Sequence, residues 1–148
     1  MNQLRVYLDL CCFNRPFDNQ RHEKIYRETE AKLYIQEKLK ERVYSLIWSY
    51  ILDFENNANP NKDARDSIQK WEKIACDIIF ENEKLKSFAG ILYNKGLGIK
   101  DALHVASAVE GRADYFFTVD KRILNKRSLI KEVRIINPVE FIAMEHKV

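Results

Sequence analysis

Five short apolar segments, separated by longer and more polar stretches, constrain the fold of this chain more than any other feature. They are rich in β-branched and aromatic residues and span residues 5–10, 42–47, 76–80, 114–119 and 133–137. Such segments predict buried strands, with 76–80 expected at an edge. Because helical patterns lie between them, the strands are expected to run parallel under helices on both faces. The sequence therefore predicts a three-layer α/β/α sandwich with right-handed crossovers.

The stretches between the strands show helical spacing. Ile25, Thr29 and Leu33 recur every four residues, which is typical of an amphipathic helix. Pro60 interrupts helical geometry, so residues 55–63 are interpreted as a helix end and a loop. The predicted helices span residues 19–41, 48–58, a stretch through Ala64, Ile68, Trp71 and Ala75, and residues 82–94, 100–110 and 138–145.

The length and composition predict one soluble domain over residues 1–148. About 46% of the residues are hydrophobic and 32% are charged, and no apolar run approaches the ~20 residues that span a bilayer. The N-terminal segment lacks the pattern of a signal peptide, so the cytoplasm is the expected location. Cys11, Cys12 and Cys76 lack zinc-site spacing and are expected as reduced thiols, the first two as small core residues.

Four acids are expected at one edge of the sheet. Asp9 ends the first strand inside an apolar run, and Asp120 follows the strand 114–119. Asp101 opens a helix that returns across the sheet, and Glu55 lies in the helix that leaves the second strand. Ligands of parallel α/β sheets bind outside the carboxyl ends of the strands. These four side chains are therefore candidates for a shared site.

Glu55 is preferred over its neighbour Asp53 because of helix phase. Trp48, Ile51 and Leu52 precede Glu55 by seven, four and three residues and share its helix face. Asp53 groups instead with polar residues. An acid on an apolar stripe is the less expected placement, so the functional assignment goes to Glu55.

Each acid also has a purely structural interpretation. Asp101 can act only as an N-cap, Asp9 can pair with a lysine or arginine, and Asp120 can belong to a surface turn. Glu55 depends on the assumed helix phase. His104 follows Asp101 by three residues and can reach the rim of the site. For His104, a partly buried helix residue hydrogen-bonded to backbone is the favoured interpretation.

Acids held this close raise one another's pKa and repel, and a divalent cation relieves the repulsion. The ligands are oxygens, which suit Mg²⁺ or Mn²⁺. Such an ion supports phosphodiester hydrolysis by activating water and stabilising the leaving oxygen. The positive end of the helix dipole is expected to favour the ionised form of Asp101.

Basic residues in segments leaving the same edge give an anionic substrate a place to bind. The net charge of +3 permits such a partner without requiring it, and affinity for a nucleic-acid backbone would fall with salt. Phe13 and Phe17 can stack on bases, although core packing is the favoured role for both. The basic candidates are Arg15, Lys100, Lys121, Arg122, Lys126 and Arg127.

Together these motifs resemble the PIN-domain ribonuclease family over the stretch from Val6 to Phe141. The similar blocks are "YLDLCCFNRPFD", "SYILDFE", "KDALHVASAV" and "ADYFFTVDKRIL". The resemblance implies an α/β/α domain with five parallel strands in the order 3-2-1-4-5 and a Mg²⁺- or Mn²⁺-dependent endoribonuclease site. Its acids would be Asp9, Glu55, Asp101 and Asp120, with Thr118 and Asn14 in supporting positions.

Many members of this family are similar to VapC toxins of toxin–antitoxin pairs. That likeness implies RNA as substrate, a homodimer, and a VapB-like antitoxin whose tail covers the acidic pocket. The chain departs from the pattern at Leu10, where many members carry Ser or Thr. A supporting hydroxyl is therefore expected to be missing.

Two alternatives remain at the level of sequence. The first is a catalytically inactive PIN-like module that binds RNA or a protein partner. The second is a phosphoryl-transfer α/β domain, but Cys11 stands where dehalogenase-like phosphatases have a second acid, and receiver domains need an acidic pair that is missing. The chain also lacks the GxxxxGK[ST] and GxGxxG phosphate-binding patterns.

Overall fold

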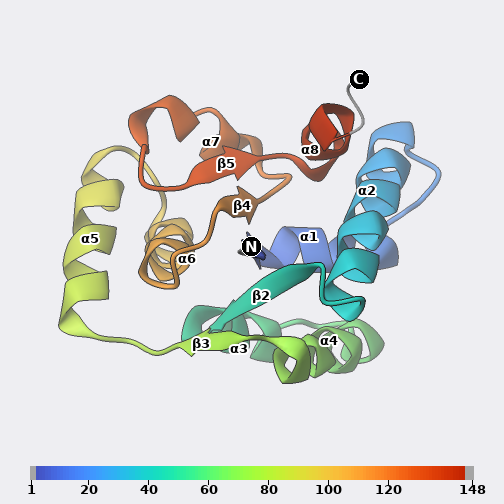
Figure 1. The fold of residues 1–148 in the computed structure, drawn as a ribbon, viewed down its shortest axis with the longest axis horizontal. Coiled ribbons are helices and arrows are strands. Elements are labelled where there is room, and N and C mark those ends of the chain that lie inside the picture. The colour runs from blue at the N-terminus through green and yellow to red at the C-terminus, as the bar shows by residue number, and fades with distance from the viewer. Residues whose placement is uncertain (1–2, 146–148) are drawn as a thin grey trace.

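The five strands form one parallel sheet in the order β3-β2-β1-β4-β5 (Figure 1). This computed structural model describes residues 3–145. All four strand pairs are parallel. The α/β/α class and the strand order implied by the resemblance are therefore confirmed. The strands are β1 (Leu4–Leu8), β2 (Tyr44–Ser49), β3 (Asp77–Ile79), β4 (Tyr115–Phe117) and β5 (Arg134–Ile136).

Helices cover both faces of this sheet. In Figure 1, α5 and α6 lie on one side of the strands, and α1 and α2 lie on the other. Within residues 3–145, no helix combines the length and apolar character needed to cross a membrane. The helices are α1 (Leu10–Asn14), α2 (Glu23–Lys40), α3 (Tyr50–Asn57), α4 (Lys62–Gln69), α5 (Glu83–Asn94), α6 (Ile99–Glu110), α7 (Lys121–Leu124) and α8 (Pro138–Glu145), with 3₁₀ turns at Arg15–Phe17, Lys70–Ile74 and Arg127–Leu129.

The second strand begins two residues later than the sequence predicts. Arg42 has a positive φ of 61°, and the amide of Val43 donates to the carbonyl of Lys38. The positive φ and this bond together form a left-handed C-cap at the end of α2. Residues 42 and 43 therefore belong to the helix terminus, and the predicted strand 42–47 becomes Tyr44–Ser49.

Other predicted boundaries also differ. The long helix predicted over 19–41 begins at Glu23, and α1 precedes it. The helix predicted through Ala64 and Ala75 stops at Gln69 and continues as a 3₁₀ turn, a common way for a helix to end. Neither α1 nor α7 was predicted, because each is too short to show a helical period.

The core lies along the central strands and under α6. Tyr7, Trp48 and Phe116 are fully buried. Gly111 ends α6 so close to β2 that a Cβ there would lie 2.6 Å from Ile47 Cγ2. This close approach fixes the C-terminal end of α6 against the sheet, so the N-terminal end is held at the carboxyl edge where β1 and β4 finish.

Candidate functional site

Asp9 lies at the end of β1 and is held by three donors. Its Oδ1 accepts from the Leu10 amide at 2.8 Å as the N-cap of α1. Its Oδ2 accepts from Thr118 Oγ1 at 2.9 Å and from the Cys11 thiol at 3.4 Å. Asp9 is only 6% exposed. Among residues 3–145, no lysine or arginine forms an ion pair with it. The interpretation of Asp9 as half of a structural salt bridge is therefore wrong.

Glu55 faces the same site from α3, which begins where Ser49 caps the Leu52 amide. The Glu55 carboxylate forms a hydrogen bond with His104 Nε2. Burial acts to raise the pKa of Glu55, but its bond to His104 and the nearby charges bring that pKa below the ordinary value. The structure therefore places this acid on the inward face of its helix.

Asp53, the competing acid, has a different environment. Its Oδ1 accepts from the indole Nε1 of Trp48 at 2.9 Å and from Gln69 Nε2 at 2.7 Å. These bonds connect α3 to the end of β2 and to α4. Asp53 therefore has a structural explanation that Glu55 lacks.

His104 is fully buried and its ring bonds to side chains on both sides. Nδ1 lies 2.6 Å from Tyr7 Oη, and Tyr7 Oη lies 2.6 Å from Ser49 Oγ. Nε2 meets Glu55 and lies 3.9 Å from Asp9 Oδ1. The prediction of a backbone-bonded histidine is therefore wrong, because Tyr7 of β1 and Glu55 of α3 take the two ring nitrogens.

Asp101 lies in the first turn of α6, but Gly98 is the N-cap and no side chain caps this helix. The predicted capping role of Asp101 is therefore wrong. Burial, followed by the charges of Asp9 and Asp120, raises the pKa of Asp101 to about 6. The direction of this pKa shift is opposite to the one expected from the helix dipole, which favours the ionised form.

Asp120 follows β4 and combines a structural contact with a place near the other acids. It caps α7 by accepting from the Arg122 amide at 2.8 Å, and its carboxylate pairs with the Arg122 guanidinium at 2.9 Å. That guanidinium bond lowers the pKa of Asp120 despite partial burial. The charge of Asp120 nevertheless contributes to the raised pKa of Asp101.

Thr118 connects two of the acids. Its hydroxyl donates to Asp9 and accepts from the Asp120 amide at 3.0 Å. The Cys11 thiol lies 3.4 Å from both Asp9 Oδ2 and Thr118 Oγ1. Cys11 was assigned to the core by sequence, yet it contacts the site. Its position two residues after Asp9 on α1 is the signal that was missed.

The side chain of Asn14 bonds to an asparagine rather than to one of the four acids. Its Oδ1 accepts from Asn59 Nδ2 at 3.0 Å, a contact between α1 and the segment after α3. This bond positions α1, whose first turn is capped by Asp9.

The basic candidates differ in whether their side chains are held by acidic partners. Arg15 is held by Glu28 at 2.9 Å and Asp18 at 2.7 Å. Arg127 pairs with Glu140 at 2.8 Å. Lys100 is exposed, with Nζ 5.7 Å from the Phe54 ring centroid. Lys121 and Arg122 are exposed at the start of α7, and Lys126 lines a pocket of about 320 Å³ together with Asp101 and Arg122.

Of the two aromatic candidates, Phe13 is fully buried and Phe17 is 43% exposed.

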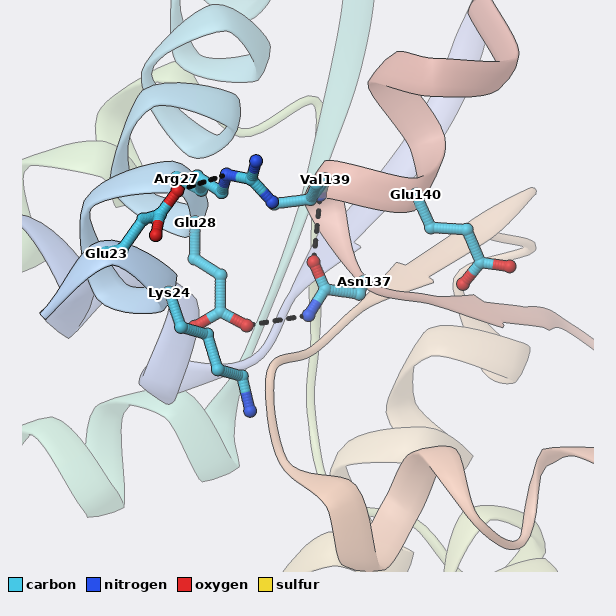
Figure 2. A pocket seen from close by; sticks show the side chains of 7 residues that line it. All are labelled: Glu23, Lys24, Arg27, Glu28, Asn137, Val139 and Glu140. Carbon is cyan, nitrogen blue, oxygen red and sulfur yellow. Dashed lines mark hydrogen bonds and ion pairs between the residues drawn. The ribbon is translucent and has the colours of Figure 1, made fainter.

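A larger pocket of about 460 Å³ lies between α2 and α8 (Figure 2). Asn137 crosses it, donating to Glu28 Oε2 at 2.7 Å and accepting from the Val139 amide at 2.8 Å. Arg27 and Glu23 also pair within it. Its lining includes none of the four acids. Since most of its polar groups already have partners, we do not assign the function to this pocket.

The acid site has the donor chemistry of a metal centre. Asp9, Glu55 and His104 each offer one ligand atom, and these atoms lie within 4.8 Å of one another. Two carboxylates and one imidazole are common ligands of divalent metals. The residues present therefore fit a divalent cation.

Comparison with known proteins gives a structural likeness. No protein-family model matches the sequence, and no curated protein matches it. The fold is similar to a chain in the crystal structure of VapBC2 from Rickettsia felis bound to a DNA fragment from their promoter. The TM-score is 0.54 at 17% sequence identity, covering 90% of this chain and 98% of that one. The two chains therefore share a fold, and the strand order β3-β2-β1-β4-β5 is the one implied by the resemblance to PIN domains.

Proposed function

We propose that this protein is a divalent-metal-dependent endoribonuclease of the VapC type, with Asp9, Glu55, Asp101 and Asp120 as its metal-binding acids. One observation carries the proposal. Asp9 after β1 and Glu55 of α3 offer ligand oxygens that lie within 4.8 Å of each other and of a ring nitrogen of His104, at the edge where parallel sheets bind ligands. Burial and the charges of Asp9 and Asp120 raise the pKa of Asp101 to about 6, which supports including Asp101 and Asp120 in the proposed site.

The chain's own residues prepare this site for an ion. The Leu10 amide and the Thr118 hydroxyl fix both oxygens of Asp9 before any ligand arrives, and His104 fixes Glu55. A bound Mg²⁺ or Mn²⁺ supplies an activated water and stabilises the leaving oxygen of a phosphodiester. The acids would hold the ion in place. Because the ion activates the attacking water, the proposed reaction needs no separate general base.

RNA is the proposed substrate. Lys100, Lys121 and Arg122 are exposed beside Asp101 and Asp120, and cations there can hold the phosphates on either side of the scissile bond. Free lysines suit phosphates as mobile point charges.

We further propose that the protein acts in the cytoplasm as a homodimer held inactive by a VapB-like antitoxin. The support is the fold shared with a chain of the VapBC2 structure, together with the motifs that resemble VapC toxins. An antitoxin segment that covered the acids would exclude both RNA and the cation.

Cleavage of an unstructured RNA, followed with and without Mg²⁺ or Mn²⁺, tests the proposal. We expect cleavage only with metal, and a loss of at least about a hundredfold in Asp101→Asn, because a metal-binding carboxylate is removed. Asp53→Asn is the matched control. That residue is an acid of the same sheet edge with structural partners only, and its variant should keep near-normal cleavage. RNA binding without cleavage under every metal condition would instead identify an inactive RNA-binding module.

A further inference from the structure

The proposed chemistry uses His104 only to hold Glu55 in place, although its ring lies between two of the acids. It comes from α6 and is fully buried, and its Nε2 points between two acids. That nitrogen meets Glu55 and lies 3.9 Å from Asp9 Oδ1. A metal ion with ligand bonds of about 2.1 Å to each atom can bridge His104 Nε2 and Asp9 Oδ1 at this separation.

We propose that His104 Nε2 is itself a ligand of the divalent cation, beside Asp9 and Glu55, so that the site prefers a first-row transition metal over Mg²⁺. The inference rests on the proposed function and adds the metal's identity to it. Imidazole nitrogen binds borderline transition metals better than it binds Mg²⁺, which prefers oxygen and retains its waters. One nitrogen among carboxylates therefore shifts the preference of the whole site.

The buried hydrogen bonds behind His104 suit a ligand. Metal-binding histidines donate the other ring N–H to a fixed acceptor, which sets the tautomer. Here Nδ1 lies 2.6 Å from Tyr7 Oη, which in turn lies 2.6 Å from Ser49 Oγ. Ser49 Oγ already accepts from the Leu52 amide and has a second lone pair for Tyr7.

Both tautomers of a neutral His104 can be satisfied by this arrangement. With the proton on Nε2, the ring donates to Glu55 and Tyr7 donates to Nδ1. With the proton on Nδ1, the ring donates to Tyr7, Tyr7 donates to Ser49, and Nε2 carries a free lone pair. The number of protons does not change.

The alternative role for His104 is purely structural, holding Glu55 in place while the acids alone bind the ion. The role as a metal ligand and the role as a positioning group both explain why His104 contacts Glu55. They differ in whether the His104 nitrogen binds the metal, which a spectroscopic measurement on bound metal detects directly.

Pulsed EPR of Mn²⁺ bound to the full-length protein provides that measurement. We expect ¹⁴N modulation from a directly bound imidazole in the wild type, and its loss in His104→Gln. The controls are His22→Gln and His146→Gln, which alter the other two histidines of the chain and should keep the modulation. His22 is exposed, and its side chain does not cap α2.

Metal affinities give a second readout that does not depend on RNA cleavage. The ratio of Mn²⁺ to Mg²⁺ affinity should fall by about tenfold in His104→Gln. Tyr7→Phe should keep the ¹⁴N modulation but weaken Mn²⁺ binding by about tenfold, because it removes the partner of Nδ1.

The possible failures are distinguishable. Bound Mn²⁺ without ¹⁴N modulation in the wild type overturns the inference and leaves an acid-only metal site in place. Modulation that persists in His104→Gln also overturns it. Modulation lost with His104 in a protein that cleaves no RNA supports the inference and contradicts the proposed ribonuclease. Absence of any Mn²⁺ binding overturns both.

Discussion

At the scale of single residues, the site depends on side chains whose partners lie far away in the sequence. His104 contacts Tyr7 and Glu55, which are 97 and 49 positions distant. Sequence periodicity carries no information about such contacts, so the sequence predicted a histidine bonded to backbone. The acids were easier to find, because a carboxylate at the end of an apolar strand is visible in the sequence itself.

Asp101 should make the metal-free protein less stable as pH rises. Its pKa is raised to about 6 by burial and by Asp9 and Asp120, so the unfolded chain releases this proton more readily than the folded one. The penalty is absent below the unfolded pKa of about 3.9 and complete above about pH 6. Asp101→Asn should therefore raise the unfolding midpoint at about pH 8 and leave it nearly unchanged at about pH 4. Thermal unfolding in the presence of a chelator measures this. An equal effect at both pH values would contradict the assignment.

Tyr7→Phe should destabilise the fold even without metal. The variant leaves the Ser49 hydroxyl and His104 Nδ1 without their shared buried partner, which costs about 1–3 kcal/mol. Urea unfolding measures this change. Tyr93→Phe is the matched control, because Tyr93 is 54% exposed and its variant should change stability by less than about 0.5 kcal/mol. Equal effects for the two variants would mean that the buried hydrogen bonds add nothing.

At the scale of elements, the strands were predicted better than the helix boundaries. Each predicted strand overlaps a real one because short apolar runs are distinct in sequence. The start of α6 was misplaced because Asp101 is a good capping residue, whereas Gly98 occupies the N-cap. The start of β2 was misplaced because Arg42 adopts a left-handed conformation that is uncommon for a residue other than glycine.

Two glycines in helical surroundings should respond oppositely to alanine. Gly111→Ala places a Cβ 2.6 Å from Ile47 Cγ2, and the resulting overpacking should cost about 1–3 kcal/mol. Gly90 lies inside α5, where a Cβ would meet nothing within 4 Å. Gly90→Ala should stabilise by about 0.5–1 kcal/mol. Chemical denaturation of both variants checks the pair. A stabilising Gly111→Ala would mean that α6 does not pack so closely on β2.

At the scale of the whole molecule, the sheet order explains why distant segments meet. β1 lies at the centre, between β2 and β4, so the residues that follow these three strands share one edge. The resemblance to a known family implied this order; the pattern of strands alone required only a parallel sheet. The sequence could not predict which of the basic residues remain free, because Arg15 and Arg127 find acidic partners only in the folded chain.

RNA binding should depend on salt and on the exposed cations of this edge. Lys121→Gln should weaken binding of unstructured RNA and lower the slope of log affinity against log salt by about 0.7, the value for one phosphate contact on a single strand. Fluorescence anisotropy over a salt series, with metal withheld, measures this. Lys73→Gln is the control. Lys73 is exposed but precedes β3, so it lies at the edge formed by the amino-terminal ends of the strands, away from the acids. An equal loss in both variants would indicate nonspecific attraction.

The claim on which the account depends is that these carboxylates exist to hold a cation. Anomalous diffraction from a crystal soaked in Mn²⁺ tests it most directly. The account predicts an ordered peak in contact with Asp9 and Glu55 and close to Asp101. A fully soaked crystal with no peak there, or with its strongest peak elsewhere on the molecule, would contradict it.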